Sequence, residues 1–474
     1  MPFRYISGAI HYFRVHPDDW RDRLRKLRYA GFDTVETYIE WASHEPEPGV
    51  YNFEGGLDLL SFLTIANEEG LLAILRPGPY IDAERDMVEN EYGSYYACDF
   101  YYTSHLKDLA KELLGEDVTL FTTDGSATSY LKCGKIADVY ATIDFGPTSD
   151  PAQLFEAQRI FEPVGPLVNS EFYPGWLDHW GDPHSTRSSE SVADTLDSML
   201  ALNASVNVYV FHGGTSFGLS AGSNTGSRFQ ACPTSYDYDA PLTEAGDPTE
   251  KYYAIRNVTQ KYVSLPDGPV PGPSEKYAYG DVLLSSTGDV FGLLDGLDTV
   301  TDTYPQTFEA LSVSNGIVVY STRIANLLPD PARLSIENIH DRGYVYVDED
   351  FVGIVSREQE LYDLPFYGKI NQTLTIVAES LGRVCYGSGI NDFKGLTTNV
   401  TIGDNILSDW NMTPIPLLNS PLLNEAISSL QSKPRQNLRQ TTSGDMTFYE
   451  GTFNIPTNSS NLQDTFLRLD GWTK

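Results

Sequence analysis

A short stretch around Glu171 combines a carboxylate with several aromatic side chains. The apolar run 166–168 predicts a buried strand that ends near Glu171, and the aromatic and imidazole residues that follow are Phe172, Tyr173, Trp176, His179 and Trp180. Because the C–H face of a sugar ring packs on aromatic rings, this combination suits chemistry on a polyol ring. A core strand that ends in an aromatic turn with one solvated glutamate has the same pattern, so the stretch alone leaves both interpretations open.

A second carboxylate lies in the run Asn90-Glu91-Tyr92-Gly93. Hydrolysis of a glycosidic bond uses two carboxyl groups, one as acid and base and the other as nucleophile or as base for a water. An asparagine directly before a glutamate can bond the sugar 2-hydroxyl, a contact that strengthens in the transition state. A solvated loop glutamate is the simpler interpretation of Glu91 alone. The pair Glu91 and Glu171 is more informative, since two strand ends of one barrel can bring them together.

These side chains need a scaffold that gathers distant segments. Strand-like runs are predicted at 5–10, 33–39, 71–75, 118–123, 138–144, 165–170 and 205–211, and helix-like runs lie at 18–29, 57–68, 102–114, 151–160 and 190–202. This alternation predicts a parallel sheet with helices outside. An open doubly wound sheet is the rival, but no glycine-rich phosphate turn follows the first strand. Polar residues cluster at the ends of the strand-like runs, as in barrel enzymes, so we predict a TIM-like α/β barrel, incomplete, with about seven strands.

The pattern changes after the barrel. We predict a βα barrel catalytic domain over 1–264, a Pro- and Gly-rich linker over 265–297 and an all-β sandwich domain over 298–415, where short alternating segments replace the helical period. Residues 416–445 are predicted to be an irregular connection. Residues 446–474 are predicted to begin a second β-domain that is truncated.

Composition limits the partners and the compartment. The 474 residues carry a formal net charge of −33, which argues against nucleic acid or an anionic membrane as a partner, and no run of about 18 apolar residues predicts a membrane span. The spacing of the four cysteines fits neither a zinc site nor a CxxC redox pair. Cys98 and Cys133 could form a disulfide in an oxidising compartment, and four buried thiols are the alternative.

Sequons for N-glycosylation suit a chain that enters the secretory pathway. They begin at Asn203, Asn257, Asn371, Asn399, Asn411 and Asn458. The N-terminal residues show no signal peptide, so we expect a sequence that begins after the true start.

Eight motifs are informative as a set. They are YISGAIHYFR, TYIEWASHEP, ILRPGPYI, VENEYGSYYACDF, NSEFYPGWLDHWG, TSYDYDAPL, RVCYGSGINDFKG and GWTK. Together they resemble the lysosomal acid β-galactosidases of glycoside hydrolase family 35, over nearly the whole chain. The resemblance implies a retaining exo-β-galactosidase that releases terminal β-linked galactose from glycolipids, glycoproteins and glycans, with no metal or organic cofactor. A homo-oligomer is left open.

The resemblance also implies roles for individual residues. Glu91 would be the acid and base, at the end of the fourth barrel strand, and Glu171 the nucleophile. Substrate contacts would come from Tyr38, Glu84, Asn90, Tyr173, Trp176, Tyr209 and Tyr238. Cys98 and Cys133 would match a disulfide of the family. Around Glu84 the chain departs from the family pattern, which tends to have Cys at Asp82 and Trp at Arg85, and Arg85 could form a surface salt bridge of little energetic value instead.

One departure bears on activity. In the family a helix and most of the fourth strand lie between the PGPYI and ENEYG motifs, whereas Ile81 and Glu89 are too close here for a crossover of about a dozen residues. We therefore expect a missing segment between about 84 and 88, which removes the strand that should aim Glu91 and impairs activity. The alternative function is a non-catalytic, lectin-like galactoside-binding protein. A structural solenoid is disfavoured because no repeat is visible.

Overall fold

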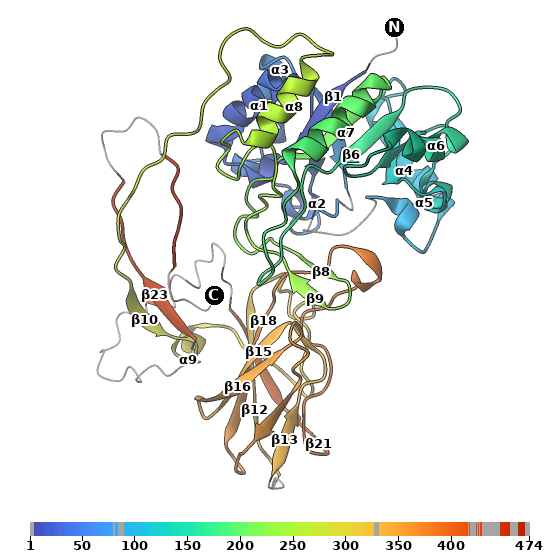
Figure 1. The fold of residues 1–474 in the computed structure, drawn as a ribbon. Coiled ribbons are helices and arrows are strands. Elements are labelled where there is room, and N and C mark those ends of the chain that lie inside the picture. Colours follow the sequence, from blue (N-terminus) through green and yellow to red (C-terminus); the bar gives the residue numbers. More distant parts are fainter. Residues whose placement is uncertain are drawn as a thin grey trace. The chain divides into compact units, whose positions relative to one another are not determined.

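The computed structural model describes residues 4–78, 81–83, 90–326, 331–415, 417, 423, 425, 427–428, 446–455 and 463–469. The chain divides into two compact units (Figure 1). The first unit contains Met1–Phe217, Pro233–Ser274 and Cys385–Ile390, and the second contains Gly218–Cys232, Glu275–Val384 and Asn391–Lys474. Each unit is described by itself.

A parallel sheet forms the centre of the first unit. Its strands are β1 (Ile6–Ile10), β2 (Thr34–Ile39), β3 (Leu72–Pro77), β4 (Phe121–Gly125), β5 (Tyr140–Asp144), β6 (Val168–Phe172) and β7 (Ser205–His212). The strand order is β3-β2-β1-β7-β6-β5-β4, and the pairings are parallel. Pairing of the first strand with the last is the arrangement of a barrel, but β3 and β4 are the two edges of this sheet. The sheet is a curled half-barrel of seven strands, which confirms the predicted incomplete barrel.

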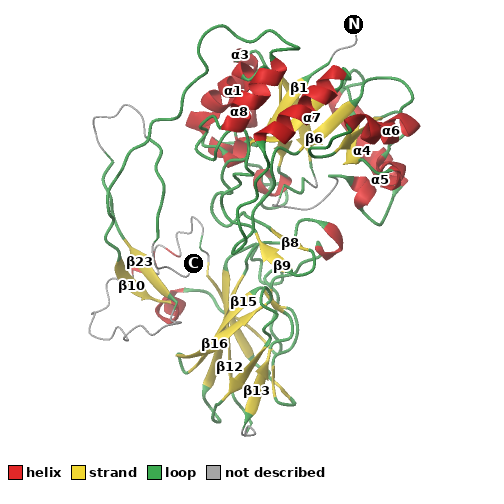
Figure 2. Cartoon of the chain, in the orientation of Figure 1, coloured by secondary structure: helices red, strands yellow, loops and turns green. Residues whose placement is uncertain are grey.

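Helices accompany the strands of this sheet, as Figure 2 shows. They are α1 (Trp20–Tyr29), α2 (Trp41–His44), α3 (Leu59–Glu68), α4 (Phe100–Leu114), α5 (Thr128–Gly134), α6 (Pro151–Phe161), α7 (Ser189–Ala201) and α8 (Glu250–Thr259). Side-chain caps fix where several of them begin: Asp58 accepts from the Ser61 amide at 2.9 Å, and Asp99 accepts from the Tyr101 amide at 2.9 Å. Short 3₁₀ helices lie at Tyr12–Arg14, Pro17–Asp19, Gly55–Leu57 and Tyr92–Ser94.

The two edge strands differ from the inner ones in burial. Every residue of β1 and β7 is buried, as expected of a parallel strand covered on both faces. On β3, by contrast, Leu72 is 54% exposed and Leu75 is 42% exposed. The exposed leucines mark the part of the sheet where a neighbouring strand and helix would complete a barrel.

The second unit is rich in antiparallel strands. One sheet has the order β11 (Val300–Asp302), β22 (Trp410–Ile415), β12 (Ile317–Arg323), β18 (Thr373–Glu379), β15 (Arg342–Val347) and β16 (Asp350–Ser356), and another has the order β17 (Asp363–Phe366), β13 (Ala332–Ser335), β20 (Thr401–Ile402) and β21 (Asn405–Ile406). An apolar core that includes Phe308, Tyr320 and Trp410 forms from residues of both sheets. The β-rich domain expected after the barrel is therefore present.

Smaller elements complete the second unit. Two-stranded pairs are formed by β8 (Ser223–Thr225) with β9 (Phe229–Ala231), by β14 (Ile339–His340) with β19 (Gly395–Leu396), and by β10 (Ser285–Asp289) with β23 (Thr447–Glu450). Both β10 and the short helix α9 (Val290–Leu293) lie within the segment predicted as a linker. Most of the predicted irregular connection, 416–445, lies outside the described residues.

Candidate active site

Glu171 lies near the carboxyl end of β6, and its side chain is buried. The strand follows the apolar run 166–168 and pairs with β5 and β7. The Tyr38 hydroxyl, from β2, lies 3.1 Å from Glu171 Oε1 and 3.2 Å from Asn90 Oδ1. The Tyr173 hydroxyl donates to Glu171 Oε2 at 3.0 Å. Three of the predicted substrate-binding residues therefore surround the predicted nucleophile.

Arg76 was not among the residues predicted from the sequence, yet it contacts Glu171 directly. Its guanidinium forms an ion pair with Glu171 Oε1, donates to Asn90 Oδ1, and lies over the Tyr38 ring at 4.4 Å from the centroid. Burial alone would lower the pKa of Arg76, but the charges of Tyr38, Glu171 and Glu36 outweigh burial and hold the pKa well above its usual value. The signal for Arg76 was available in the sequence, since a charged residue directly before Pro77 ends an otherwise apolar strand.

Glu91 lies at the start of the short 3₁₀ helix η4 (Tyr92–Ser94), with a left-handed backbone of φ 47°. Its carboxyl interacts electrostatically with the side chains of Asp144, at the end of β5, and Tyr386. Burial, followed by the negative charge of Glu171, raises the pKa of Glu91 to about 7. Glu91 and Glu171 are within electrostatic reach of each other. Glu91 is the carboxyl that can keep a proton up to about neutral pH, and Glu171 is the carboxyl that is paired with the Arg76 cation.

Asp124, at the end of β4, fixes the turn that carries Glu91. Its Oδ1 accepts a hydrogen bond from the Gly93 amide at 2.7 Å. Burial raises the pKa of Asp124 to about 8. A Cβ on Gly93 would lie 2.1 Å from the Tyr130 carbonyl oxygen, so this close approach requires glycine. The turn therefore packs directly on β4 and α5.

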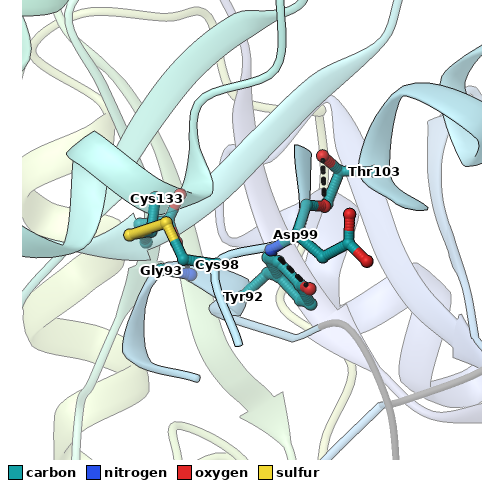
Figure 3. The surroundings of a disulfide bond; sticks show 7 residues. Tyr92, Gly93, Cys98, Asp99, Thr103 and Cys133 are labelled. Carbon is teal, nitrogen blue, oxygen red and sulfur yellow. Dashed lines mark hydrogen bonds between the residues drawn. A yellow bond between two sulfur atoms is a disulfide. The ribbon is translucent and has the colours of Figure 1, made fainter. Parts of the chain in front are cut away.

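Cys98 and Cys133 form a disulfide that joins the segment after this turn to α5, as Figure 3 shows. The bond closes a sequence separation of 35 residues. In the same view the Tyr92 hydroxyl accepts from the Asp99 amide at 3.1 Å, next to the start of α4. The turn with Glu91 is thus held by β4, and the disulfide ties down the segment that follows the turn. The other two cysteines, Cys232 and Cys385, are buried.

The remaining predicted aromatic residues form one group beside Glu171. The ring centroids of Tyr173 and Trp176 are 5.2 Å apart, those of Tyr173 and Tyr209 are 6.3 Å apart, and those of Tyr209 and Tyr238 are 5.8 Å apart. We call these four residues the aromatic cluster. Trp176 is 42% exposed, so part of the residue is accessible to a ligand. Hydrogen bonding and ring contact together bring Tyr38, Asn90 and the aromatic cluster around Glu171.

Two of the remaining predicted residues cannot be placed relative to this site. Glu84 lies outside the described residues, as does the sequon asparagine Asn458. The other sequon asparagines are all exposed, as glycosylation requires: Asn203, Asn257, Asn371, Asn399 and Asn411. Burial lowers the pKa of His212 to about 3, and its Nε2 lies 3.1 Å from the Glu244 carbonyl oxygen, so this histidine is a neutral structural group.

Among the described helices, none has the length and apolar character needed to cross a bilayer.

The family model described as "Glycosyl hydrolases family 35" matches residues 1–88 and 87–262, and the model "Beta-galactosidase, first all-beta domain" matches residues 305–416. The boundary between the two blocks of the first match falls next to the position where the sequence predicts a missing segment.

Curated relatives match the entire chain. The chain is 43% identical over 535 residues to "Beta-galactosidase" of Bos taurus, an alignment that covers 100% of this chain and 82% of that protein. It is 42% identical over 541 residues to "Beta-galactosidase" of Homo sapiens, covering 100% of this chain and 79% of that protein. It is 41% identical over 540 residues to "Beta-galactosidase-1-like protein" of Mus musculus, covering 100% of this chain and 80% of that protein. These alignments are longer than the 474 residues of the chain, so the relatives carry residues that the chain lacks.

Proposed function

Since the chain belongs to glycosyl hydrolases family 35, we propose that it is a retaining exo-β-galactosidase that hydrolyses terminal β-linked galactose from glycolipids, glycoproteins and glycans. The arrangement around Glu171 carries this proposal. Tyr38, Tyr173 and Arg76 direct their donors at its carboxylate, and the protonatable Glu91 is within electrostatic reach. A lysosomal or secreted location fits the exposed sequon asparagines.

Glu171 acts as the nucleophile in the first step. The ion pair with Arg76 and the hydrogen bond from Tyr38 hold Oε1, while Tyr173 holds Oε2. A carboxylate fixed in this way attacks the anomeric carbon with little reorganisation, which is the main contribution of a pre-organised site. The aromatic cluster packs on the sugar ring and orients it for the attack.

Glu91 acts as the acid and then as the base. With a pKa raised to about 7, Glu91 keeps its proton under acidic conditions and can give it to the glycosidic oxygen as the bond breaks. In the second step the Glu91 carboxylate takes a proton from the attacking water, and the bond between the sugar and Glu171 is released. Asn90 binds the sugar 2-hydroxyl.

A covalent trap tests this proposal. A 2-deoxy-2-fluorogalactosyl compound with an activated leaving group should inactivate the chain, and peptide mass analysis should place the adduct on Glu171. Glu171→Gln should abolish labelling, and Glu91→Gln should slow release of galactose from an alkyl galactoside by about 100-fold or more.

The open edge of the half-barrel favours a second candidate, a lectin-like galactoside-binding protein. The exposed Leu72 and Leu75 show that β3 lacks the cover of a complete barrel. A non-catalytic chain would bind galactose reversibly through the aromatic cluster, with no adduct at Glu171 and no release of an aglycone at acidic pH. Restoring the missing segment would then create activity, whereas an already competent site would gain little from it.

A further inference from the structure

Arg76 reaches the site from an edge of the half-barrel. It lies on β3, an edge strand whose hydrogen-bonded neighbour is β2. In the register of these two strands Tyr38 lies opposite Arg76, and Glu36 lies two residues earlier on β2. Because alternate residues of a strand share a face, Glu36 and Tyr38 project to the same side of β2. This strand therefore offers two side chains to the Arg76 guanidinium.

Both side chains contact Arg76, at different parts of the guanidinium. The face of the Tyr38 ring packs against it, with the centroid 4.4 Å from the central carbon, and Glu36 Oε1 lies 3.6 Å from Nε. The two terminal nitrogens contact other groups: Nη1 pairs with Glu171 Oε1, and Nη2 donates to Asn90 Oδ1. Since a guanidinium is planar and its N–H directions are fixed, a contact at Nε constrains where the other two nitrogens point.

Glu36 is enclosed by the half-barrel, and its carboxyl group has few partners. The residue is 1% exposed. Asn207 Nδ2 lies 3.4 Å from Glu36 Oε2 and also donates to the Ser170 carbonyl oxygen at 3.0 Å. Glu36 Oε1 is buried and, within the part of the chain that the structure describes, has no partner at hydrogen-bond distance. The ion pair with Arg76 is thus the contact that accounts for a carboxyl group at this depth.

Glu36 and Glu171 both lie against one cation. Burial raises the pKa of Glu36 to about 7, with the charge of Arg76 opposing the shift and the charge of Glu171 adding to it. Below that pH the Glu36 side chain carries a proton on one oxygen, while the other oxygen still accepts a hydrogen bond. A protonated Glu36 can therefore hold Arg76 Nε and leave the positive charge to Glu171.

We infer that Glu36 is a positioning residue that holds the guanidinium of Arg76 against the carboxylate of Glu171. This inference rests on the proposed function, in which Glu171 is the nucleophile. Contact with the face of the Tyr38 ring fixes the plane of the guanidinium but leaves rotation within that plane free. Glu36, at Nε, opposes this rotation and keeps Nη1 on Glu171 Oε1.

Labelling of Glu171 tests the inference, because a 2-deoxy-2-fluorogalactosyl compound with an activated leaving group needs the nucleophile and no acid. Glu36→Leu should slow labelling by about tenfold or more, the effect of losing one contact to a charged group. Glu36→Gln keeps an acceptor oxygen without a charge and should recover most of this loss. Thr34→Val is the matched control: it removes another buried hydroxyl or carboxyl group from β2, one that donates to Asp33 Oδ1 at 2.9 Å, and should label at the rate of the unaltered chain.

A double variant separates positioning from a general effect on the fold. In an Arg76→Met background, Glu36→Leu should slow labelling no further, because the group through which Glu36 acts is gone. A further slowing of about tenfold in that background would overturn the inference. So would a Glu36→Leu protein that labels within twofold of Thr34→Val.

A measurement that needs no reaction separates this inference from the proposed function. In protein labelled with ¹⁵N at arginine, the Nε–H resonance of Arg76 is assigned by its loss in Arg76→Met. Exchange of this hydrogen with solvent should be about tenfold faster in Glu36→Leu, and Glu36→Gln should restore most of the protection. If the galactosyl compound does not react with the chain but exchange responds in this way, the proposed function fails and the hold of Glu36 on Arg76 stands. If exchange is equal in Glu36→Leu and the unaltered chain, the positioning role is wrong, whatever the activity.

Discussion

Replacing Gly93 with alanine should displace the turn that carries Glu91. A Cβ at this position would lie 2.1 Å from the Tyr130 carbonyl oxygen and 2.6 Å from Asp124 Oδ1, whereas ordinary contacts begin at 3.4 Å. Because Tyr130 is part of α5, the turn must move by about 1 Å or more and lose its hydrogen bond to Asp124. A misplacement of about 1 Å in a catalytic group costs about 100-fold in rate, so we expect a loss of that size in kcat/KM.

The substrate identifies which step is affected. In the proposed mechanism Glu91 supplies a proton to the leaving group, so Gly93→Ala should lose about 100-fold with an alkyl galactoside and much less with 2,4-dinitrophenyl galactoside. Labelling of Glu171 by the fluorinated sugar with an activated leaving group should stay near the rate of the unaltered chain. Gly56→Ala is a suitable control, because a Cβ there would meet nothing within 4 Å.

Folding must be checked in parallel by thermal unfolding, since a backbone clash also lowers stability. A Gly93→Ala protein that unfolds at the same temperature as Gly56→Ala and hydrolyses the alkyl galactoside within threefold of it would refute the reasoning. The contact between the Gly93 turn and β4 would then have no part in positioning Glu91.

Other predictions concern Arg76, the pH profile and the disulfide. Arg76→Met should slow labelling of Glu171 and lower kcat/KM by about 100-fold or more, because it leaves a buried carboxylate without its cation. Arg76→Lys should recover part of the loss. Equal rates in the unaltered protein and in Arg76→Met would contradict a role of Arg76 in holding Glu171. The activity should be present below pH 7 and fall as the pH rises through about 7, because Glu91 must hold its proton to act as the acid; a kcat/KM profile that stays flat up to pH 9 would exclude this. Replacing Cys98 and Cys133 by serine should lower the free energy of unfolding by about 4 kcal/mol, the chain-entropy value for a loop of 35 residues, as measured by urea denaturation. An unchanged denaturation midpoint would mean that the disulfide does not constrain the unfolded chain.

The scaffold was largely predictable from the sequence because its signals are local. Apolar runs of strand length alternate with amphipathic helical runs, and the carboxyl ends of parallel strands gather at one edge. Glu171 comes three residues after the apolar run 166–168, so its place near a strand end needed no information from elsewhere in the chain. The seven parallel strands also agree with the number of strand-like runs.

The interactions that shift the pKa values of the carboxyl groups were harder to predict from the sequence, because they join segments that are distant along the chain. Arg76 and Glu171 come from opposite halves of the sheet order, and Tyr386 reaches Glu91 from a segment far beyond the barrel strands. Asp144 is a polar residue at a strand end, but its interaction with Glu91 depends on how the Gly93 turn packs against β4. Such pairings follow from tertiary structure and not from a periodic pattern.

The open edge of the half-barrel does not affect the two carboxyls of the proposed mechanism equally. Glu171 lies on β6, which has a hydrogen-bonded neighbour on each side, and Tyr38 lies on β2, which is also paired on both sides. The proposed nucleophile therefore lies on the continuous part of the half-barrel. Glu91, by contrast, is placed through contacts with the edge strand β4, namely the Gly93 amide to Asp124, and through the nearby Cys98–Cys133 disulfide.

This asymmetry fixes the form that impaired activity must take. A chain weakened by the open edge should still form the bond to Glu171 when the leaving group is activated, and it should fail with alkyl galactosides, for which the acid is essential. Supplying azide should then speed release of the trapped sugar, because a small anion attacks the anomeric carbon without help from a base. A chain that fails equally with both kinds of substrate and does not respond to azide would instead have lost the nucleophile, which the paired strands around β6 argue against.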